Sequence, residues 1–158
     1  MEIDIDLSAQ RLRLCDGENQ VMDVAVSTGV NGIGEQNGSG CTPRGRHQVR
    51  AKIGQGAPPG AVFRGRRWTG EVWTPEAHDT QPGRDWILTR ILWLSGLEPG
   101  RNRLGPVDTF RRYIYLHGTP PVTALGTPGS KGCIRMNNAD IIRLFDLVAP
   151  GTVVNLHE

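Results

Sequence analysis

The sequence predicts a mostly β protein, a sandwich or partly closed barrel, with one short helix that follows a turn around Cys133. Three observations lead to this class. Short runs of alternating apolar and polar residues recur along the chain. The 21 glycines and 11 prolines indicate many tight turns between short strands. Only one segment, near the C-terminus, repeats its apolar residues with the spacing of a helix.

The length and composition fit a single domain over residues 1–158. Hydrophobic residues make up 37% and the net charge is +2, which excludes a disordered chain, a coiled coil and a collagen-like repeat. The mild basicity does not call for nucleic acid, and no apolar run approaches the ~18 residues of a membrane helix. We therefore expect neither nucleic acid nor a membrane as a partner.

The first elements are strands. Ile3, Ile5 and Leu7 alternate with polar residues, as in a half-buried strand, and Leu12 and Leu14 repeat the pattern. A turn at 16–17 then leads into a return strand at 21–26. The segment 27–45 is rich in glycine and asparagine and is predicted as a long loop. Further strand segments are predicted at 47–53, 61–73, 86–94 and 113–116, with a second polar loop at 74–84.

The helix follows the chain's last glycine-rich segment. Asn138 is predicted as its N-cap, and Asp140 is favourable in the first turn. The apolar residues from Ile141 to Val148 have helical spacing, and Pro150 ends the helix. A closing strand is predicted at 152–156.

The chemistry is concentrated in two motifs, His117-Gly118 and the run from Ser130 to Arg135. Cys133 lies in a glycine-flanked turn, where a substrate carbonyl can approach the sulfur and where backbone N–H groups can stabilise an oxyanion. His117, at the end of a strand, can form a Cys–His pair that makes a thiolate at neutral pH. Lys131 and Arg135 add positive charge. The alternative is that Cys133 is a small core residue and His117 a satisfied strand-end histidine.

Other polar residues have simpler interpretations. No metal or phosphate motif occurs, so no cofactor and no metal site are expected. The arginines at 64, 66 and 67 are interpreted as a solvated hairpin face, and His47 as a surface or loop residue. Trp93 and Tyr115 are expected in the core. The loops at 31–41 and 74–84 are candidates to cover a cleft.

The two motifs resemble those of the L,D-transpeptidase (YkuD-type) family, in which a histidine precedes a Ser/Thr-His-Gly-Cys segment followed by an apolar residue and Arg or Asn. The resemblance continues in four further segments, Ile5-Asp6-Leu7-Ser8-Ala9-Gln10, Val26-Ser27-Thr28-Gly29, Thr42-Pro43-Arg44-Gly45 and Gly151-Thr152-Val153-Val154. It implies a mixed β-sandwich with a short helix, which agrees with the pattern of the elements.

The resemblance also implies roles. Cys133 becomes the nucleophile, His117 its base, and the Gly118 carbonyl the group that orients the imidazole. The N–H groups of Gly132 and Cys133 line the oxyanion hole, Arg135 binds a substrate carboxylate, and Ser130 matches the Ser/Thr position. Lys131 replaces the family's usual histidine, so it either keeps a cation beside Cys133 or points to solvent.

The implied reaction is attack by Cys133 on an L,D-amide of a peptidoglycan stem peptide, through a thioester. The opening residues lack the basic and apolar parts of a secretory leader, so a cytoplasmic location is expected, or a periplasmic one if a leader was removed. The sequence thus favours an L,D-carboxypeptidase that trims tetrapeptides in murein recycling. The alternatives are an exported L,D-transpeptidase, which forms cross-links or exchanges D-amino acids, and a non-catalytic peptidoglycan-binding domain.

Overall fold

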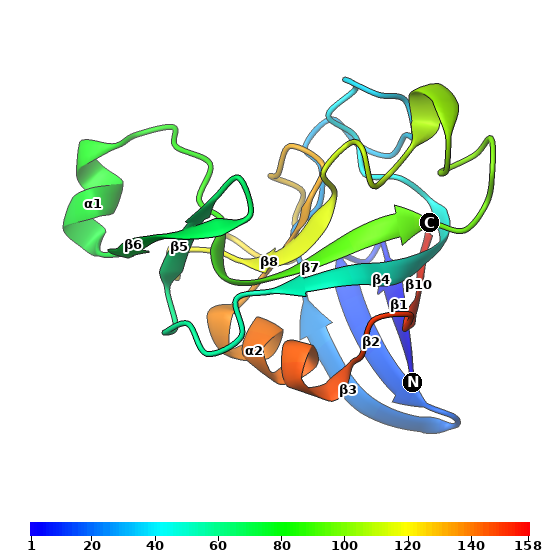
Figure 1. Cartoon of the computed structure of the whole chain (residues 1–158), viewed down its shortest axis with the longest axis horizontal. Helices are drawn as coiled ribbons and strands as arrows, with labels where there is room; N and C mark the ends of the chain where they lie inside the picture. The colour runs from blue at the N-terminus through cyan, green and yellow to red at the C-terminus, as the bar shows by residue number, and fades with distance from the viewer.

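The computed structural model describes residues 1–158 and contains one curled, mixed sheet of ten strands (Figure 1). The order is β3-β2-β1-β10-β4-β7-β5-β6, and β8 joins β7 to β9. The pairs β1–β10 and β8–β9 are parallel, and the others are antiparallel. This confirms the predicted mostly β, mixed fold. The strands are β1 (Glu2–Asp6), β2 (Arg11–Asp16), β3 (Asn19–Ala25), β4 (Gly45–Ile53), β5 (Ala61–Arg64), β6 (Arg67–Val72), β7 (Leu88–Gly96), β8 (Tyr115–Gly118), β9 (Ile134–Met136) and β10 (Val153–His157).

The alternation read from the N-terminal residues sets the register of the first hairpin. Ile3 lies opposite Leu14, and Ile5 lies opposite Leu12. All four side chains are buried, while the residues between them face outward. Because successive side chains of a strand point to opposite faces, a slip of one residue would expose the whole apolar set. The predicted strands are therefore fixed by burial of this face.

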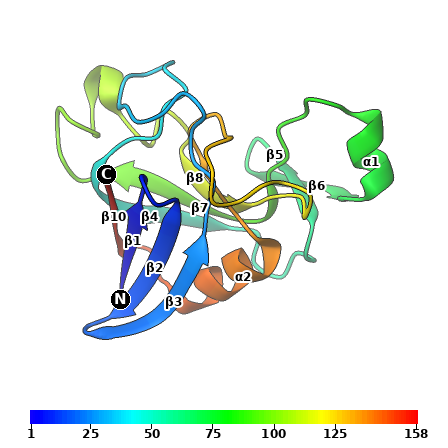
Figure 2. The same cartoon turned by 180° about the vertical axis from the view of Figure 1, so that it is seen from behind.

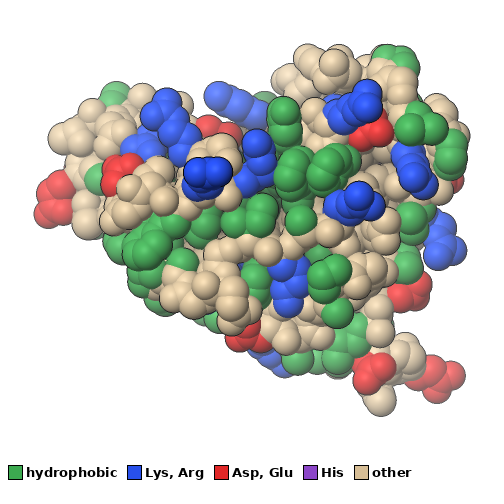
Figure 3. Space-filling view, in the orientation of Figure 1, with side chains coloured by type: hydrophobic (Ala, Val, Ile, Leu, Met, Phe, Trp, Pro, Cys, Tyr) green, Lys and Arg blue, Asp and Glu red, His purple; other side chains and the backbone are tan.

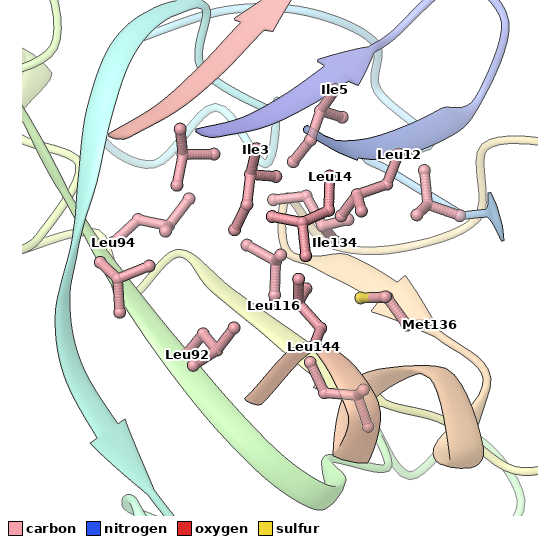
Figure 4. Close-up of a cluster of buried hydrophobic side chains, with 14 of the residues drawn as sticks. Ile3, Ile5, Leu12, Leu14, Leu92, Leu94, Leu116, Ile134, Met136 and Leu144 are labelled. Atoms are coloured by element: carbon pink, nitrogen blue, oxygen red, sulfur yellow. The ribbon is translucent and has the colours of Figure 1, made fainter. Parts of the chain in front are cut away.

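The main core fills the concave side of the sheet and consists of 20 buried residues (Figure 4). Helix α2 (Asn138–Leu147) covers one side of this core. It buries Ile141, Leu144 and Phe145 against β7 and β8. The N-cap is Asn137, one residue before the predicted Asn138, because the Asn137 side chain accepts from Ala139 N–H at 2.9 Å. Asn138 instead turns inward and accepts from the hydroxyl of Thr89.

A lobe made of β5, β6 and helix α1 (Pro75–Thr80) projects from the rest of the molecule (Figure 2). The predicted polar loop at 74–84 is wrong here, since α1 occupies half of it. Thr74 caps this helix by accepting from Ala77 N–H at 3.1 Å, and Pro75 stands in the first turn, where proline is tolerated. The predicted 61–73 segment is a hairpin, with β5 largely buried and β6 exposed throughout.

The interpretation of His47 as a surface or loop residue is also wrong. His47 is completely buried on β4, where Nε2 lies 2.8 Å from the hydroxyl of Thr109 and Nδ1 lies 3.0 Å from the carbonyl of Gly45. Burial lowers the pKa of His47 to about 4, so the ring is neutral and its two nitrogens are both satisfied.

The two α-helices and a single 3₁₀ turn, η1 (Gly105–Val107), complete the fold. None of them has the length and apolar character to cross a membrane. All three cysteines are free thiols.

Candidate active site

Parallel pairing of β8 with β9 brings the two predicted motifs together. Leu116 is the register partner of Ile134, and both side chains enter the main core. Since side chains alternate along a strand, the neighbours Tyr115, His117 and Cys133 lie on the opposite face. The topology therefore places His117 on β8 and Cys133, the residue directly before β9, on the same side of this strand pair.

His117 is held as a neutral base. Its ring is fully buried, and Nδ1 lies 2.6 Å from the carbonyl of Gly118. A carbonyl can only accept, so Nδ1 carries the proton and Nε2 keeps a lone pair. Nε2 is buried and has no hydrogen-bond partner. Burial lowers the pKa of His117, so the imidazole is uncharged at neutral pH.

Cys133 is a neutral thiol in this arrangement, which differs from the expected thiolate. Its Sγ lies 3.3 Å from the carbonyl of Tyr113 and 3.3 Å from the N–H of Tyr115. Burial raises the pKa of Cys133 to about 12, and this desolvation outweighs the favourable charges of Arg135 and Arg112. The thiol also packs against a small cluster that is separate from the main core. If this thiol acts as a nucleophile, its proton has to be removed during the attack rather than before it.

The turn that carries Cys133 is fixed by its neighbours. Gly132 has a φ of +119°, and a Cβ there would lie 3.0 Å from the carbonyl oxygen of Cys41, so only glycine fits. The buried Ser130 hydroxyl lies 2.5 Å from the Cys133 carbonyl and accepts from Gly132 N–H at 3.1 Å. Thr42 donates to the Gly132 carbonyl at 2.9 Å. The Gly132 N–H, predicted as an oxyanion donor, is thus already engaged by Ser130.

Gly118 is required where it stands. A Cβ at this position would collide with Oδ1 of Asn138 and lie 2.7 Å from the carbonyl oxygen of Leu88. The absence of a side chain lets β8 approach β7 and the start of α2 closely. The Gly118 carbonyl, which accepts from His117, is positioned by this contact.

Arg135 does not present a free guanidinium. Its Nη2 lies 3.0 Å from Oδ1 of Asp85, and its Nη1 donates to the carbonyl of Gly129 at 2.9 Å. The expected role of Arg135 in binding a substrate carboxylate therefore competes with an internal carboxylate. Asp85 precedes β7, and its negative charge favours a higher pKa for both His117 and Cys133.

An open cavity of about 260 Å³ reaches the sulfur. Its wall combines aromatic and aliphatic side chains with charged ones, and one of these, Lys131, is exposed. Among nearby charges, Asp85 raises the pKa of Cys133, while Arg135 and Arg112 lower it. The space-filling view shows basic side chains gathered beside the β5–β6 hairpin (Figure 3). The cavity is lined by Phe63, Gly65, Arg66, Asp85, Ile87, Ile91, Tyr113, Tyr115, Lys131 and Cys133.

Sequence reasoning missed three polar contributors to the site. Arg66 lines the cavity although its cluster is interpreted from the sequence as a solvated face. Asp85 directly follows the predicted loop at 74–84 and pairs with Arg135. Arg112 donates to the carbonyl of Cys41 at 2.6 Å and so ties the 31–41 loop to the segment that precedes β8. Gly65 was the signal in the sequence that could have placed Arg66. A glycine between two strand-forming runs indicates a hairpin turn, and Arg66 is the next residue.

Tyr115 has two environments. Its side chain is buried in the small cluster, as expected of a core residue, yet it also forms part of the cavity wall. Trp93 lies behind it, with the two ring centroids 5.7 Å apart in an edge-on contact. No group of three or more His, Cys, Asp or Glu side chains comes together as a metal centre would need.

Comparison with known proteins gives a consistent result. A model of the L,D-transpeptidase catalytic domain family matches residues 1–156. The YkuD protein of Bacillus subtilis (strain 168), itself named only provisionally as an L,D-transpeptidase, is 37% identical over 62 residues, 36% of this chain and 38% of that protein.

Solved structures share the fold. An L,D-transpeptidase from Mycobacterium smegmatis has a TM-score of 0.57 at 18% identity, over 99% of this chain and 58% of that one. L,D-transpeptidase 3 from Mycobacterium tuberculosis, in complex with a faropenem-derived adduct, has a TM-score of 0.55 at 16% identity, over 99% and 59%. The chain thus spans less than two thirds of the length of these relatives.

Proposed function

Because the chain belongs to the L,D-transpeptidase catalytic domain family, we propose that it is a cysteine L,D-carboxypeptidase that removes the terminal D-Ala from peptidoglycan stem tetrapeptides. One observation carries this proposal. The unprotonated, unpartnered Nε2 of His117 lies on the same face of the β8–β9 pair as the thiol of Cys133. A base with a free lone pair and a neutral thiol are the two groups that acyl transfer through a thioester needs.

Each proton transfer and each bond formed or broken in the proposed reaction is accounted for. Cys133 Sγ attacks the carbonyl of the diamino acid while its proton passes to Nε2 of His117. The bond from this carbonyl to the D-Ala nitrogen then breaks, and His117 returns the proton to the leaving amine. Water attacks the thioester, gives a proton to His117, and the thiol re-forms with release of a tripeptide.

Two features support stabilisation of the tetrahedral intermediate by the Cys133 turn. The turn presents backbone N–H groups beside the sulfur, and its conformation is fixed by glycine at 132 and by the Ser130 hydroxyl. An oxyanion would take over the Gly132 N–H from Ser130, which lies 3.1 Å away. The Arg135 and Arg112 guanidiniums add positive charge around the sulfur.

The size of the cavity favours hydrolysis. About 260 Å³ accommodates a short peptide segment rather than two peptides side by side. The opening is also exposed to solvent along Lys131 and Tyr113, so water reaches the thioester. Free tetrapeptides of the kind released during wall turnover are therefore the substrates we propose.

A second candidate function is transpeptidation. A neighbouring cavity of about 300 Å³ adjoins the first, because both are lined by Phe63 and Asp85. Its other lining residues are Arg64, Gln81 and Arg84, which are polar and long. A second peptide placed there could deliver its amine to the thioester in place of water.

The decisive experiment uses the purified protein and a murein tetrapeptide, with and without an added acceptor amine, followed by mass spectrometry. Hydrolysis releases a tripeptide and D-Ala in both reactions. If only acceptor-linked product forms, the activity is transpeptidation and not the proposed carboxypeptidase reaction. An unchanged tetrapeptide in both would contradict the proposal.

The control is Cys133→Ala, which removes the sulfur while keeping a small side chain in the turn. The variant should bind the tetrapeptide and release nothing. If the parent protein also binds and releases nothing, the domain is a peptidoglycan-binding module in which the thiol has no catalytic role.

A further inference from the structure

Arg66 occupies a backbone position that favours other residues. It and Gly65 form the two-residue tip between the paired residues Arg64 and Arg67, at the end of β5 and β6. Both tip residues have positive φ, +54° for Gly65 and +63° for Arg66. Such hairpin turns favour glycine or asparagine. A residue with a long side chain, such as arginine, is disfavoured at the second position because its φ is positive. Strained residues of this kind gather at functional sites.

The unusual backbone directs the Arg66 guanidinium back over the cavity. The guanidinium lies 4.9 Å from the centre of the Trp93 ring and 4.9 Å from the centre of the Tyr113 ring. Its Nη1 donates to the hydroxyl of Tyr115 at 3.1 Å. Three aromatic side chains therefore hold a planar cation in one orientation, on a cavity whose wall includes Cys133.

No carboxylate of the protein neutralises this cation. Asp85 is the one acidic residue on the cavity wall, and its partner is Arg135. Arg66 takes part in no ion pair, and neither does Lys131 on the same wall. The cavity beside the sulfur therefore carries a net positive charge, with one of its two free cations rigidly placed.

From this geometry we propose that Arg66 is a specificity-determining residue that binds a carboxylate of the acyl-donor peptide through its free N–H groups. The inference rests on the proposed function, since it assumes that a peptide enters the cavity to reach Cys133. The fork of a guanidinium matches a carboxylate with two parallel hydrogen bonds. The carboxylate belongs either to the leaving D-Ala or to the side chain of the diamino acid, and the recognising chemistry is the same.

The test compares three tetrapeptides that differ by one group: the free acid, the amide of the diamino acid side chain, and the C-terminal amide. The variants are Arg66→Met, which removes the charge, and Arg66→Lys, which keeps it without the fork. Arg67→Met is the matched control, because Arg67 is an exposed arginine on the same hairpin with no ion pair.

We expect Arg66→Met to lower kcat/KM for the free acid by about 10- to 100-fold, mostly through KM, and Arg66→Lys to lower it less. For the one amide that lacks the recognised carboxylate, Arg66→Met and the parent protein should react equally. That amide identifies the source of the carboxylate. Equal losses on all three peptides, or a loss as large in Arg67→Met, would overturn the proposal.

Binding separates this inference from the proposed function. In a Cys133→Ala background, calorimetry should show that Arg66→Met weakens binding of the free acid about 10-fold or more and leaves binding of the matching amide unchanged. If the parent protein turns over no peptide but this difference holds, the carboxypeptidase proposal fails while the role of Arg66 stands. If binding does not depend on Arg66, the proposed role of Arg66 is wrong, whether or not the parent protein turns over the peptide.

Discussion

The carboxylate of Asp85 lies 3.0 Å from the guanidinium of Arg135, and the same carboxylate acts electrostatically on both His117 and Cys133. It thereby opposes the effect of Arg135, which favours a lower pKa in both groups. Burial has the largest effect on the pKa of His117 and of Cys133. The opposed charges of Asp85 and Arg135 adjust these shifted pKa values further.

Asp85→Asn should therefore lower the pKa of both Cys133 and His117, since a negative charge beside them is lost and Arg135 is left unopposed. At a fixed alkaline pH, a thiol-alkylating reagent should modify Cys133 faster in this variant. The rate of alkylation followed by intact mass is the measurement. Asp79→Asn is the control, because Asp79 is exposed on α1 and does not line the cavity. An unchanged rate in Asp85→Asn would contradict this electrostatic role.

The thiol of Cys133 should be the single point of covalent attack by a carbapenem or penem. A strained β-lactam ring opens on a nucleophilic sulfur, so such a drug reports directly on the reactivity of this thiol. Intact mass should rise by one drug molecule in the parent protein and in Cys41→Ser, and not in Cys133→Ser. His117→Gln should slow the addition by about 10²- to 10⁴-fold, the usual contribution of a general base. Labelling of Cys41 would contradict the assignment.

The pH dependence of kcat/KM should have an acid limb that lies below the ordinary histidine pKa of 6.5. His117 accepts the proton only while it is neutral, and burial lowers its pKa, so protonation and loss of activity occur at a lower pH than in an exposed histidine. Rates between pH 4 and 9, with circular dichroism at each pH to confirm folding, would show this limb. A flat profile over the range would exclude His117 as the base.

The parts of this site that the sequence predicts are those with a local signature. Cys133 is flanked by a glycine and followed by a capped helix, and His117 ends an apolar strand, so each is recognisable within its own segment. Parallel pairing of two short strands then brings them together. The residue types suggested the Cys–His pair and the family resemblance implied it, whereas the parallel pairing of β8 with β9 was not predicted.

The residues that escaped prediction act through contacts distant in sequence. The Arg66 guanidinium lies over the rings of Trp93 and Tyr113, and Asp85 forms an ion pair with Arg135. A basic residue in a hairpin is usually solvated, and only the placement of β7 and β8 makes Arg66 part of a wall. His47 escaped for a similar reason, because its buried partner Thr109 is contributed by a distant loop.

Gly118→Ala tests how the histidine is oriented. The added Cβ would collide with Asn138 and press on the carbonyl of Leu88, so β8 must shift, and we expect a loss of about 1–3 kcal/mol in the free energy of unfolding. Activity should fall further than stability explains, because the Gly118 carbonyl accepts from His117. Adding Asn138→Ala removes only the first obstacle and should restore stability in part. Full stability in the single variant, measured by urea unfolding, would contradict the packing argument.

His47 should make the protein less stable in acid. The pKa of His47 is about 4 in the folded state and near 6.5 when unfolded, so between these values the unfolded chain binds a proton that the native state does not. The stabilisation is present above pH 6.5 and is lost as the pH falls toward 4. At 1.36 kcal/mol per pH unit, the loss is about 3 kcal/mol.

His47→Gln removes this titration, so its free energy of unfolding should change less between pH 6.5 and 4 than that of the parent protein. His157→Gln is the matched control with the opposite sign. The Asp4 carboxylate raises the pKa of His157, so its contribution is present below pH 6.5 and is lost as the pH rises through the folded pKa. Urea unfolding at several pH values measures both slopes. An acid dependence in His47→Gln as steep as in the parent protein would place the destabilisation elsewhere, with His117 the other buried histidine of lowered pKa.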